Sequence, residues 1–240
     1  MSDLQTLRGW VRDAHRIVLL TGAGMSAESG VPTFRDAQTG LWAEFDPQQL
    51  ATEAAFRKNP RLVWDWYTMR REMVGKVAPN AGHLAIAQFQ QRHPGRLTLV
   101  TQNVDGLHQR AGSADTIALH GTLAKDQWLD TPRICCNMDT VSEGHPPYCG
   151  VCGNMLRPAV VWFGESLPPH ALARAEEAAD TSDLLLVVGT SGVVYPAAGL
   201  AHRVEGRVVI VNPESSGLDA VATLVVRGTA ATVLPGVLPD

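Results

Sequence analysis

The chain has 240 residues, of which 45% are hydrophobic and 18% are charged, and its formal net charge is −4. This composition is typical of a soluble globular protein, with either one α/β domain that carries an insertion or two domains. The slightly acidic balance gives no electrostatic reason to bind nucleic acid or an anionic membrane, so we expect neither as a partner. The apolar runs are far shorter than the roughly 20 residues of a membrane-spanning helix, and the N-terminus lacks a secretory signal, so we expect a cytoplasmic protein.

Six short apolar runs, rich in β-branched residues and bounded by turn formers, predict buried strands. They are residues 17–20, 97–100, 117–119, 184–188, 208–211 and 223–226. Helical periodicity between several of them, as in 83–91 and 170–179, favours an open parallel α/β sheet with crossover helices. Ligands of such sheets bind at the carboxyl ends of the strands. Polar motifs follow almost every one of these runs, which predicts a ligand site at that edge.

The first run breaks directly into a glycine-rich segment that contains Gly22, Gly24 and Gly30. Glycines at the end of a buried strand let backbone N–H groups approach a pyrophosphate. The third glycine comes later than in the usual Gly-x-Gly-x-x-Gly fingerprint. For Gly-x-Gly alone, an ordinary strand-to-helix turn is an equally good interpretation.

Four further motifs follow later runs. They are Gln102-Asn103-Val104-Asp105-Gly106-Leu107-His108, His120-Gly121, Gly189-Thr190-Ser191 and Asn212-Pro213-Glu214. Together with the glycine-rich segment, and in this order, they closely resemble the sirtuins, the NAD-dependent protein lysine deacylases, from about residue 8 to about residue 235. The resemblance implies a Rossmann-like fold, NAD as a consumed co-substrate, and acylated lysine side chains of proteins as the partner.

Two longer segments interrupt the pattern of strands. Residues 36–80 read as helical, and residues 121–165 carry the four cysteines. We predict that these segments form a smaller lobe, helical in one part and a zinc ribbon in the other. The large Rossmann-like domain would then comprise residues 1–35, 81–120 and 166–240.

His120 follows the run 117–119, so we expect it at the same edge of the sheet. Its imidazole titrates near neutral pH, as a general base acting on a ribose hydroxyl requires. A lone histidine is otherwise more often structural, and Asn103-x-Asp105 is also compatible with a simple turn. The resemblance makes His120 the base and assigns Gln102 and Asn103 to the nicotinamide ribose and its water. It assigns Asp105 to the carboxamide, and we predict His120 and Asn103 as the catalytic residues.

The resemblance also implies the positions that bind NAD. Phe34 would shield a reactive intermediate from water, and Arg35 would supply a cation to the phosphates. Asn212 or Glu214 would hydrogen-bond the ribose hydroxyls of the adenosine half. The predicted NAD-binding residues are Gly22, Ala23, Gly24, Glu28, Thr33, Phe34, Arg35, Gln102, Asn103, Asp105, Gly189, Thr190, Ser191, Asn212, Glu214 and Ala230.

The segment 62–77 predicts a helix with one apolar face, and Tyr67 and Arg70 share that face because they are three residues apart. A guanidinium there needs an anionic partner. One alternative is an internal carboxylate, such as Glu44 or Asp46. The resemblance offers another, since Tyr-x-x-Arg marks the sirtuins that remove acidic acyl groups such as succinyl and malonyl.

Other substrate-binding positions are also implied by the resemblance. Ala51 would leave room for a longer acyl chain. The segment 160–165 resembles the one that pairs with the substrate peptide as an added strand, which predicts Val161, Phe163 and Gly164 as substrate-binding residues. Pairing of that kind tolerates many peptide sequences.

The cysteines depart from the sirtuin pattern of two Cys-x-x-Cys pairs, because Trp128 and Thr131 stand where the first pair is expected. The chain instead has Cys135-Cys136 and then Cys149-x-x-Cys152. Clustered cysteines favour a metal site over a disulfide framework. We predict a structural zinc bound by Cys135, Cys136, Cys149 and Cys152. Three cysteines completed by His145, or no metal, are the alternatives.

Two other functions use the same features. Mono-ADP-ribosyl transfer would use the same NAD site, although an acyl-lysine tunnel beside His120 and Val161 argues against it. The second alternative is a non-enzymatic protein. It would be either an NAD or ADP-ribose sensor or a zinc-ribbon adaptor for nucleic acid. The presence of Asn103, Asp105 and His120 together argues against a sensor, and the acidic net charge argues against an adaptor.

Overall fold

The computed structural model describes residues 2–33, 50–113 and 115–238. Its main feature is a six-stranded sheet in the order β10-β9-β8-β1-β2-β3, in which every neighbouring pair is parallel. The strands are β1 (Ile17–Thr21), β2 (Leu97–Thr101), β3 (Thr116–Ala118), β8 (Leu184–Val188), β9 (Arg207–Val211) and β10 (Leu224–Val226). The six predicted runs all belong to this sheet, and the predicted open parallel fold is confirmed.

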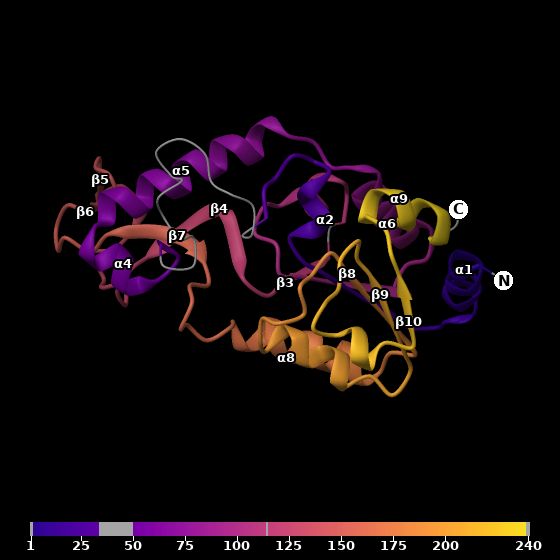
Figure 1. Ribbon diagram of the computed structural model, residues 1–240. Helices are drawn as coiled ribbons and strands as arrows, with labels where there is room; N and C mark the ends of the chain where they lie inside the picture. The colour runs from indigo at the N-terminus through magenta and orange to yellow at the C-terminus, as the bar shows by residue number, and fades with distance from the viewer. Residues whose placement is uncertain (1, 34–49, 114, 239–240) are drawn as a thin grey trace.

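Helices cover both faces of the sheet, which is why its strands are apolar along their whole length (Figure 1). One face packs against α1 (Asp3–Asp13), α6 (Ala81–Arg92) and α9 (Ala230–Val237). The other face packs against α8 (Pro169–Asp180) and the 3-10 helix Ala197–His202. Short helices α2 (Gly24–Ala27) and α7 (Leu107–Arg110) follow β1 and β2, and a 3-10 turn, Asp219–Val221, precedes β10.

A second group of elements lies beyond β3, on the left of Figure 1. It contains α4 (Glu53–Lys58), α5 (Pro60–Lys76) and the antiparallel pair β4 (Gly121–Trp128) and β7 (Leu156–Val160). The small hairpin β5 (Val141–Ser142) and β6 (Tyr148–Cys149), preceded by the 3-10 turn Met138–Thr140, carries part of the cysteine cluster. We call this group the small lobe; the domain boundaries given above remain a prediction.

The small lobe has an apolar core of its own, built where α4 and α5 pack on β4 and β7. Its largest buried side chains are Phe56, Trp66 and Trp162, and the Phe56 and Trp162 rings lie 5.3 Å apart. The helix α5 begins at Pro60, whose fixed φ suits the first turn, and the Asn59 side chain caps it by accepting the Leu62 N–H. Among the described residues, no helix is long and apolar enough to cross a membrane.

Candidate active site

The register of the sheet brings the polar motifs together. Thr21 at the end of β1 lies opposite Thr101 of β2 and Val188 of β8, and Val188 lies opposite Val211 of β9. The next residue of each strand extends the ladder by one more hydrogen bond, as in Gln102 N–H to the Thr21 carbonyl at 2.9 Å. The glycine-rich segment, the Gln102–His108 motif, Gly189-Thr190-Ser191 and Asn212-Pro213-Glu214 therefore all leave the same edge of the sheet.

Close contact between two loops explains the glycines after β1. A Cβ on Gly22 would lie 2.6 Å from the Thr190 Cβ, and one on Gly24 would lie 2.9 Å from the Gly189 Cα. Gly189 itself has a φ of +60°, in the left-handed region that favours glycine. The Gly24 N–H donates to the Gly189 carbonyl at 2.8 Å. Because the two loops pack this closely, positions 22 and 24 have no room for a side chain, and Ala23 between them carries only a methyl group.

Asn103 and Asp105 are tied to α2 through Ser26. The Ser26 hydroxyl donates to Asp105 Oδ2 at 2.7 Å, and the Asn103 amide donates to Ser26 Oγ at 3.3 Å. The other Asp105 oxygen accepts the Leu107 N–H at 2.8 Å. The sequence resemblance places Ser26 along the diphosphate, but the buried hydroxyl has these two side chains as neighbours. The loop after β2 is thereby fixed against the loop after β1.

Two buried histidines, His83 of α6 and His108 of α7, lie beneath this loop with ring centroids 4.7 Å apart. His108 Nε2 lies 3.0 Å from Thr21 Oγ1, and the Thr21 and Thr101 hydroxyls are 2.7 Å apart. Thr101 Oγ1 also accepts the Asn103 N–H at 3.0 Å. Burial lowers the pKa of His83 to about 4 and that of His108 to about 3, so both are neutral at pH 7.

The sequence alone assigned these two histidines no part in the site, and it did not indicate that Ser26 contacts Asn103 and Asp105. One signal was available for His83, since it stands three residues after Asn80, the spacing of a capping box. The Asn80 side chain accepts the N–H groups of Gly82 and His83, and His83 Nδ1 accepts the Asn80 N–H at 3.3 Å. This cap fixes the ring orientation and leaves Nε2 facing Ser26 Oγ at 3.5 Å.

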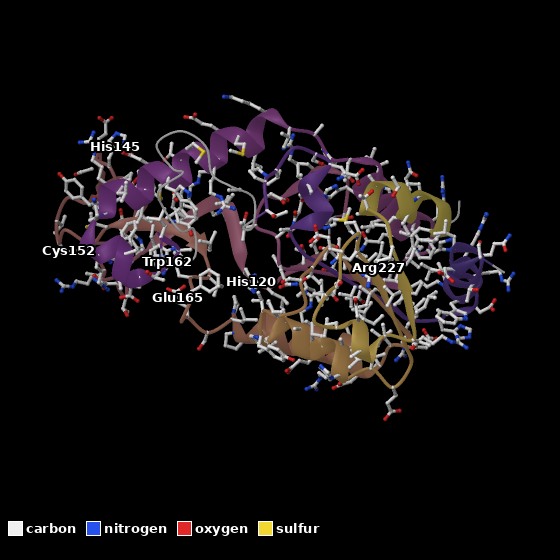
Figure 2. The ribbon with its side chains drawn as sticks, viewed as in Figure 1. His120, His145, Cys152, Trp162, Glu165 and Arg227 are labelled. Carbon is white, nitrogen blue, oxygen red and sulfur yellow. The ribbon has the colours of Figure 1, made fainter. Side chains whose placement is uncertain are left out.

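His120 lies between β3 and β4, where the sheet meets the small lobe (Figure 2). Its Nδ1 is 3.1 Å from the Gln102 carbonyl oxygen, which can only accept, so the proton must sit on Nδ1. Nε2 of the neutral ring is therefore the unprotonated nitrogen. Burial lowers the pKa of His120 and the bond to Gln102 opposes that shift. The neutral form, which a general base needs, is the one favoured at pH 7.

The remaining edge residues form a chain of polar contacts. The Gln102 amide donates to Thr190 Oγ1 at 3.1 Å, and the Asn212 amide donates to the Thr190 carbonyl at 3.1 Å. Glu28 accepts the Ala231 N–H at 3.0 Å, next to Ala230 at the start of α9. Other predicted NAD-binding residues at this edge are Ala23, Ser191 and Glu214, whose carbonyl accepts from Arg227. Thr33 is the last described residue of its segment, and Phe34 and Arg35 lie outside the described residues.

The predicted substrate residues lie in the small lobe. The Tyr67 hydroxyl accepts the Trp162 indole N–H at 3.0 Å, and burial raises the pKa of Tyr67 to about 12. The Arg70 guanidinium lies 4.9 Å from the centroid of the Trp66 ring. Burial lowers the pKa of Arg70, and the smaller influences of Tyr67 and Asp105 raise it. Glu44 and Asp46, the alternative partners of Arg70, lie outside the described residues.

The other substrate positions bridge the two parts of the molecule. The Val161 N–H donates to the His120 carbonyl, and the Phe163 N–H donates to the Ala51 carbonyl, each at 2.9 Å. Phe163 is 46% exposed, and Gly164 has a φ of +90°. The segment after β7 thus connects His120 with Ala51, which lies just before the first residue of α4.

The four cysteines form one cluster, in which all Sγ atoms lie within 4.8 Å of one another. Four thiolates about 2.3 Å from a zinc ion in a tetrahedron are about 3.8 Å apart, so the set fits zinc with little adjustment. Burial of Cys149 opposes ionisation, but the N–H groups of Cys152 and Val151 lower its pKa to about 6. His145, the alternative fourth ligand, instead has Nδ1 3.5 Å from Asp65 Oδ1.

Comparison with known proteins matches residues 22–196 to the family model described as "Sir2 family". A curated "NAD-dependent protein deacylase" of Ralstonia nicotianae is 58% identical over 234 residues, covering 96% of this chain and 94% of the relative. A second "NAD-dependent protein deacylase", of Mycolicibacterium paratuberculosis, is 50% identical, covering 93% of this chain and 96% of the relative. A solved "Sir2 homolog-NAD complex" has a TM-score of 0.85 at 40% identity, covering 98% of this chain and 92% of that one. "Sir2Tm bound to a propionylated peptide" has a TM-score of 0.82 at 28% identity, covering 97% and 96%.

Proposed function

Because the chain belongs to the Sir2 family, we propose that it is an NAD-dependent protein lysine deacylase that consumes NAD and transfers the acyl group to ADP-ribose. The observation that carries the proposal is the state of His120. Its Nδ1 is committed to the Gln102 carbonyl, and its Nε2 is left as a base at the edge where Asn103 and Asp105 are held. Relatives named as deacylases, and a neighbour solved with NAD, support the same reading.

The residues at this edge of the sheet have separate roles in binding and in the reaction. Asn103 and Asp105, fixed through Ser26, hold the nicotinamide end of NAD, and the backbone of residues 22–24 faces the diphosphate. Thr190 and Asn212 lie on the adenosine side. NAD supplies the ribose carbon that the acyl oxygen attacks as nicotinamide leaves. His120 Nε2 then removes the proton of the ribose hydroxyl that attacks the acyl carbon, and water completes the release of free lysine and O-acyl-ADP-ribose.

We further propose that acidic acyl groups, such as succinyl and malonyl, are removed as well as acetyl. Tyr67 and Arg70 support this, because a phenol and a guanidinium on one face of α5 are suited to a carboxylate. The low net charge and the thiol cluster support a cytoplasmic enzyme without nucleic acid or membrane partners. A structural zinc held by Cys135, Cys136, Cys149 and Cys152 would stabilise the small lobe, away from the chemistry.

The test is mass spectrometry of one lysine peptide, prepared in acetylated and succinylated forms and incubated with the protein with and without NAD. We expect free lysine peptide, nicotinamide and O-acyl-ADP-ribose in equal amounts, and only with NAD. Release of nicotinamide with ADP-ribose attached to a protein, and no free lysine, would instead establish ADP-ribosyl transfer. Binding of NAD with no product of either kind would establish a sensor.

A further inference from the structure

A buried ion pair holds the segment that follows β7. Arg157 of β7, whose side chain is 4% exposed, donates to both carboxylate oxygens of Glu165. The same guanidinium donates to the Val160 carbonyl at 2.6 Å, and Glu165 Oε2 accepts the Trp162 N–H at 2.8 Å. The ion pair and the backbone on both sides of Trp162 thus form one closed set of contacts. Trp162 and Glu165 lie close together in Figure 2.

The same ion pair fixes the Trp162 side chain. The Arg157 guanidinium carbon lies 3.4 Å from the centroid of the Trp162 ring, a close cation–π contact. Phe56 of α4 packs against the same indole, and Trp162 is 1% exposed. The ring therefore has no room to turn, and the direction of its N–H is fixed.

That N–H determines what the Tyr67 hydroxyl can do. An indole N–H only donates, so Tyr67 Oη accepts at 3.0 Å and must point its own proton elsewhere. Within the described parts of the chain, this is the one hydrogen bond of the Tyr67 hydroxyl. Because burial keeps the phenol protonated, the Tyr67 O–H remains to be donated. Arg70, three residues further along α5, lies beside the same Trp66 ring as Tyr67, because its guanidinium is 4.9 Å and the Tyr67 ring 4.6 Å from the centroid of that ring.

We propose that Trp162, held by the Arg157–Glu165 ion pair, is a positioning residue that aims the Tyr67 O–H beside Arg70 and so creates a preference for acyl groups ending in a carboxylate. The inference rests on the proposed deacylase function where turnover is concerned, but binding of the acylated peptide can be measured without that function. A carboxylate accepts from both the phenol and the guanidinium. A neutral acetyl group ends in a methyl and gains nothing from the direction of the O–H.

The test measures binding first and turnover second. Dissociation constants for one lysine peptide in succinylated and acetylated forms are measured without NAD, followed by kcat and KM with NAD. In Trp162→Phe the ring contacts largely remain and the N–H is lost. We expect the succinyl peptide to bind roughly tenfold more weakly, with a matching rise in KM, and acetyl values to change by less than about twofold.

Further variants test whether the Trp162 N–H acts through the Tyr67 hydroxyl. Tyr67→Phe should lose the same selectivity as Trp162→Phe. The double variant, with both substitutions, should lose no more than either single variant, because both changes act on the same donor, the Tyr67 O–H. Trp64→Phe is the matched control on α5, since its ring lies under Arg71 instead of Arg157, and it should keep the parent selectivity. If Trp162→Phe does not fold, benzothienylalanine at position 162 keeps the ring shape and removes only the N–H.

The outcomes separate the inference from the proposed function. Equal weakening of both peptides, or unchanged selectivity, in Trp162→Phe would overturn the inference and leave Trp162 as a packing residue. A parent protein that binds both peptides equally would also overturn it. A parent that prefers the succinyl peptide, loses the preference in Trp162→Phe and turns over neither peptide would support the inference and overturn the deacylase proposal.

Discussion

The edge of the parallel sheet and the small lobe hold their polar groups in different ways. At the edge, Ser26, His83 and His108 are uncharged: Ser26 and His108 are held by hydrogen bonds of 2.7 and 3.0 Å to Asp105 and Thr21, and His83 is held by the cap of α6. In the small lobe, Arg157 is a buried charge paired with Glu165, and it stacks on an aromatic ring. Strand register brings the polar groups of the edge together, whereas side-chain contacts hold those of the small lobe. The two regions should therefore respond differently to substitution and to pH.

The largest effect is expected at the edge, in the chemistry. His120→Ala removes the base at Nε2 and should lower NAD-dependent release of lysine by about 10²- to 10⁴-fold, as loss of a general base does. NAD binding should be retained, because the Gln102–Thr190 contact does not depend on the imidazole. Turnover by mass spectrometry and NAD titration by calorimetry check both statements.

His170→Ala is the matched control for that experiment, since His170 is exposed at the start of α8. It should behave like the parent protein. A His120→Ala variant with parental turnover would remove the base from the mechanism and return the histidine to a structural role.

The second effect concerns the cysteines of the small lobe. Cys152→Ser should reduce bound zinc from about one equivalent to little or none, and loss of a structural metal costs more than about 4 kcal/mol of stability. His145→Ala should keep the metal, because His145 faces Asp65. Metal analysis by mass spectrometry and denaturant unfolding check this. Loss of zinc in His145→Ala would restore the three-cysteine alternative.

The third effect tests the ion pair of the small lobe. Glu165→Gln leaves the buried Arg157 without its counter-charge, and the cost should lie near the lower end of about 3–5 kcal/mol because Glu165 is 28% exposed. Glu177→Gln, on the exposed face of α8, is the control and should cost less than about 0.5 kcal/mol. Equal midpoints for both variants in urea would show that the lobe does not depend on the pair.

The fourth effect concerns pH and the edge histidines. Their pKa values of about 4 and about 3 lie below the value of 6.5 expected when unfolded. Below pH 6.5 the unfolded chain binds protons that the folded protein does not, so stability falls as the pH drops toward 4. The slope is up to about 1.4 kcal/mol per pH unit for each histidine. Above pH 6.5 these residues contribute no slope.

Urea unfolding at pH 7, 6 and 5 measures that slope. His83→Gln should make it shallower, because glutamine preserves the capping box at this position without titrating. His170→Ala, at an exposed site, should leave the slope unchanged. The same slope in His83→Gln and the parent would show that the buried pair does not control the acid stability.

Much of the edge could be predicted from the sequence. The strands are continuous apolar runs bounded by turn formers, and parallel strands align their ends, so the motifs after them had to meet. Asn103, Asp105 and His120 were expected at this edge for this reason, and they lie there. His83, His108 and the contacts of Ser26 with Asn103 and Asp105 were missed, because these contacts join separate segments and no local pattern encodes them. Tyr67 and Arg70 were predicted on one helix face and lie on α5, but the sequence did not connect Trp162 and Arg157 to them.

The amino-acid sequence by itself determined the strands, the parallel sheet, the edge that carries the motifs and the cysteines available for a metal, because periodicity and turn residues act over a few neighbours. Only the tertiary structure decided which nitrogen of His120 is free, that His83 and His108 stay neutral, and which way the Tyr67 proton points. Tyr67 and Trp162 are 95 positions apart in the chain, and the pKa values depend on burial by distant segments. Desolvation and hydrogen-bond direction are properties of the packed molecule, so they appear only when the chain is folded.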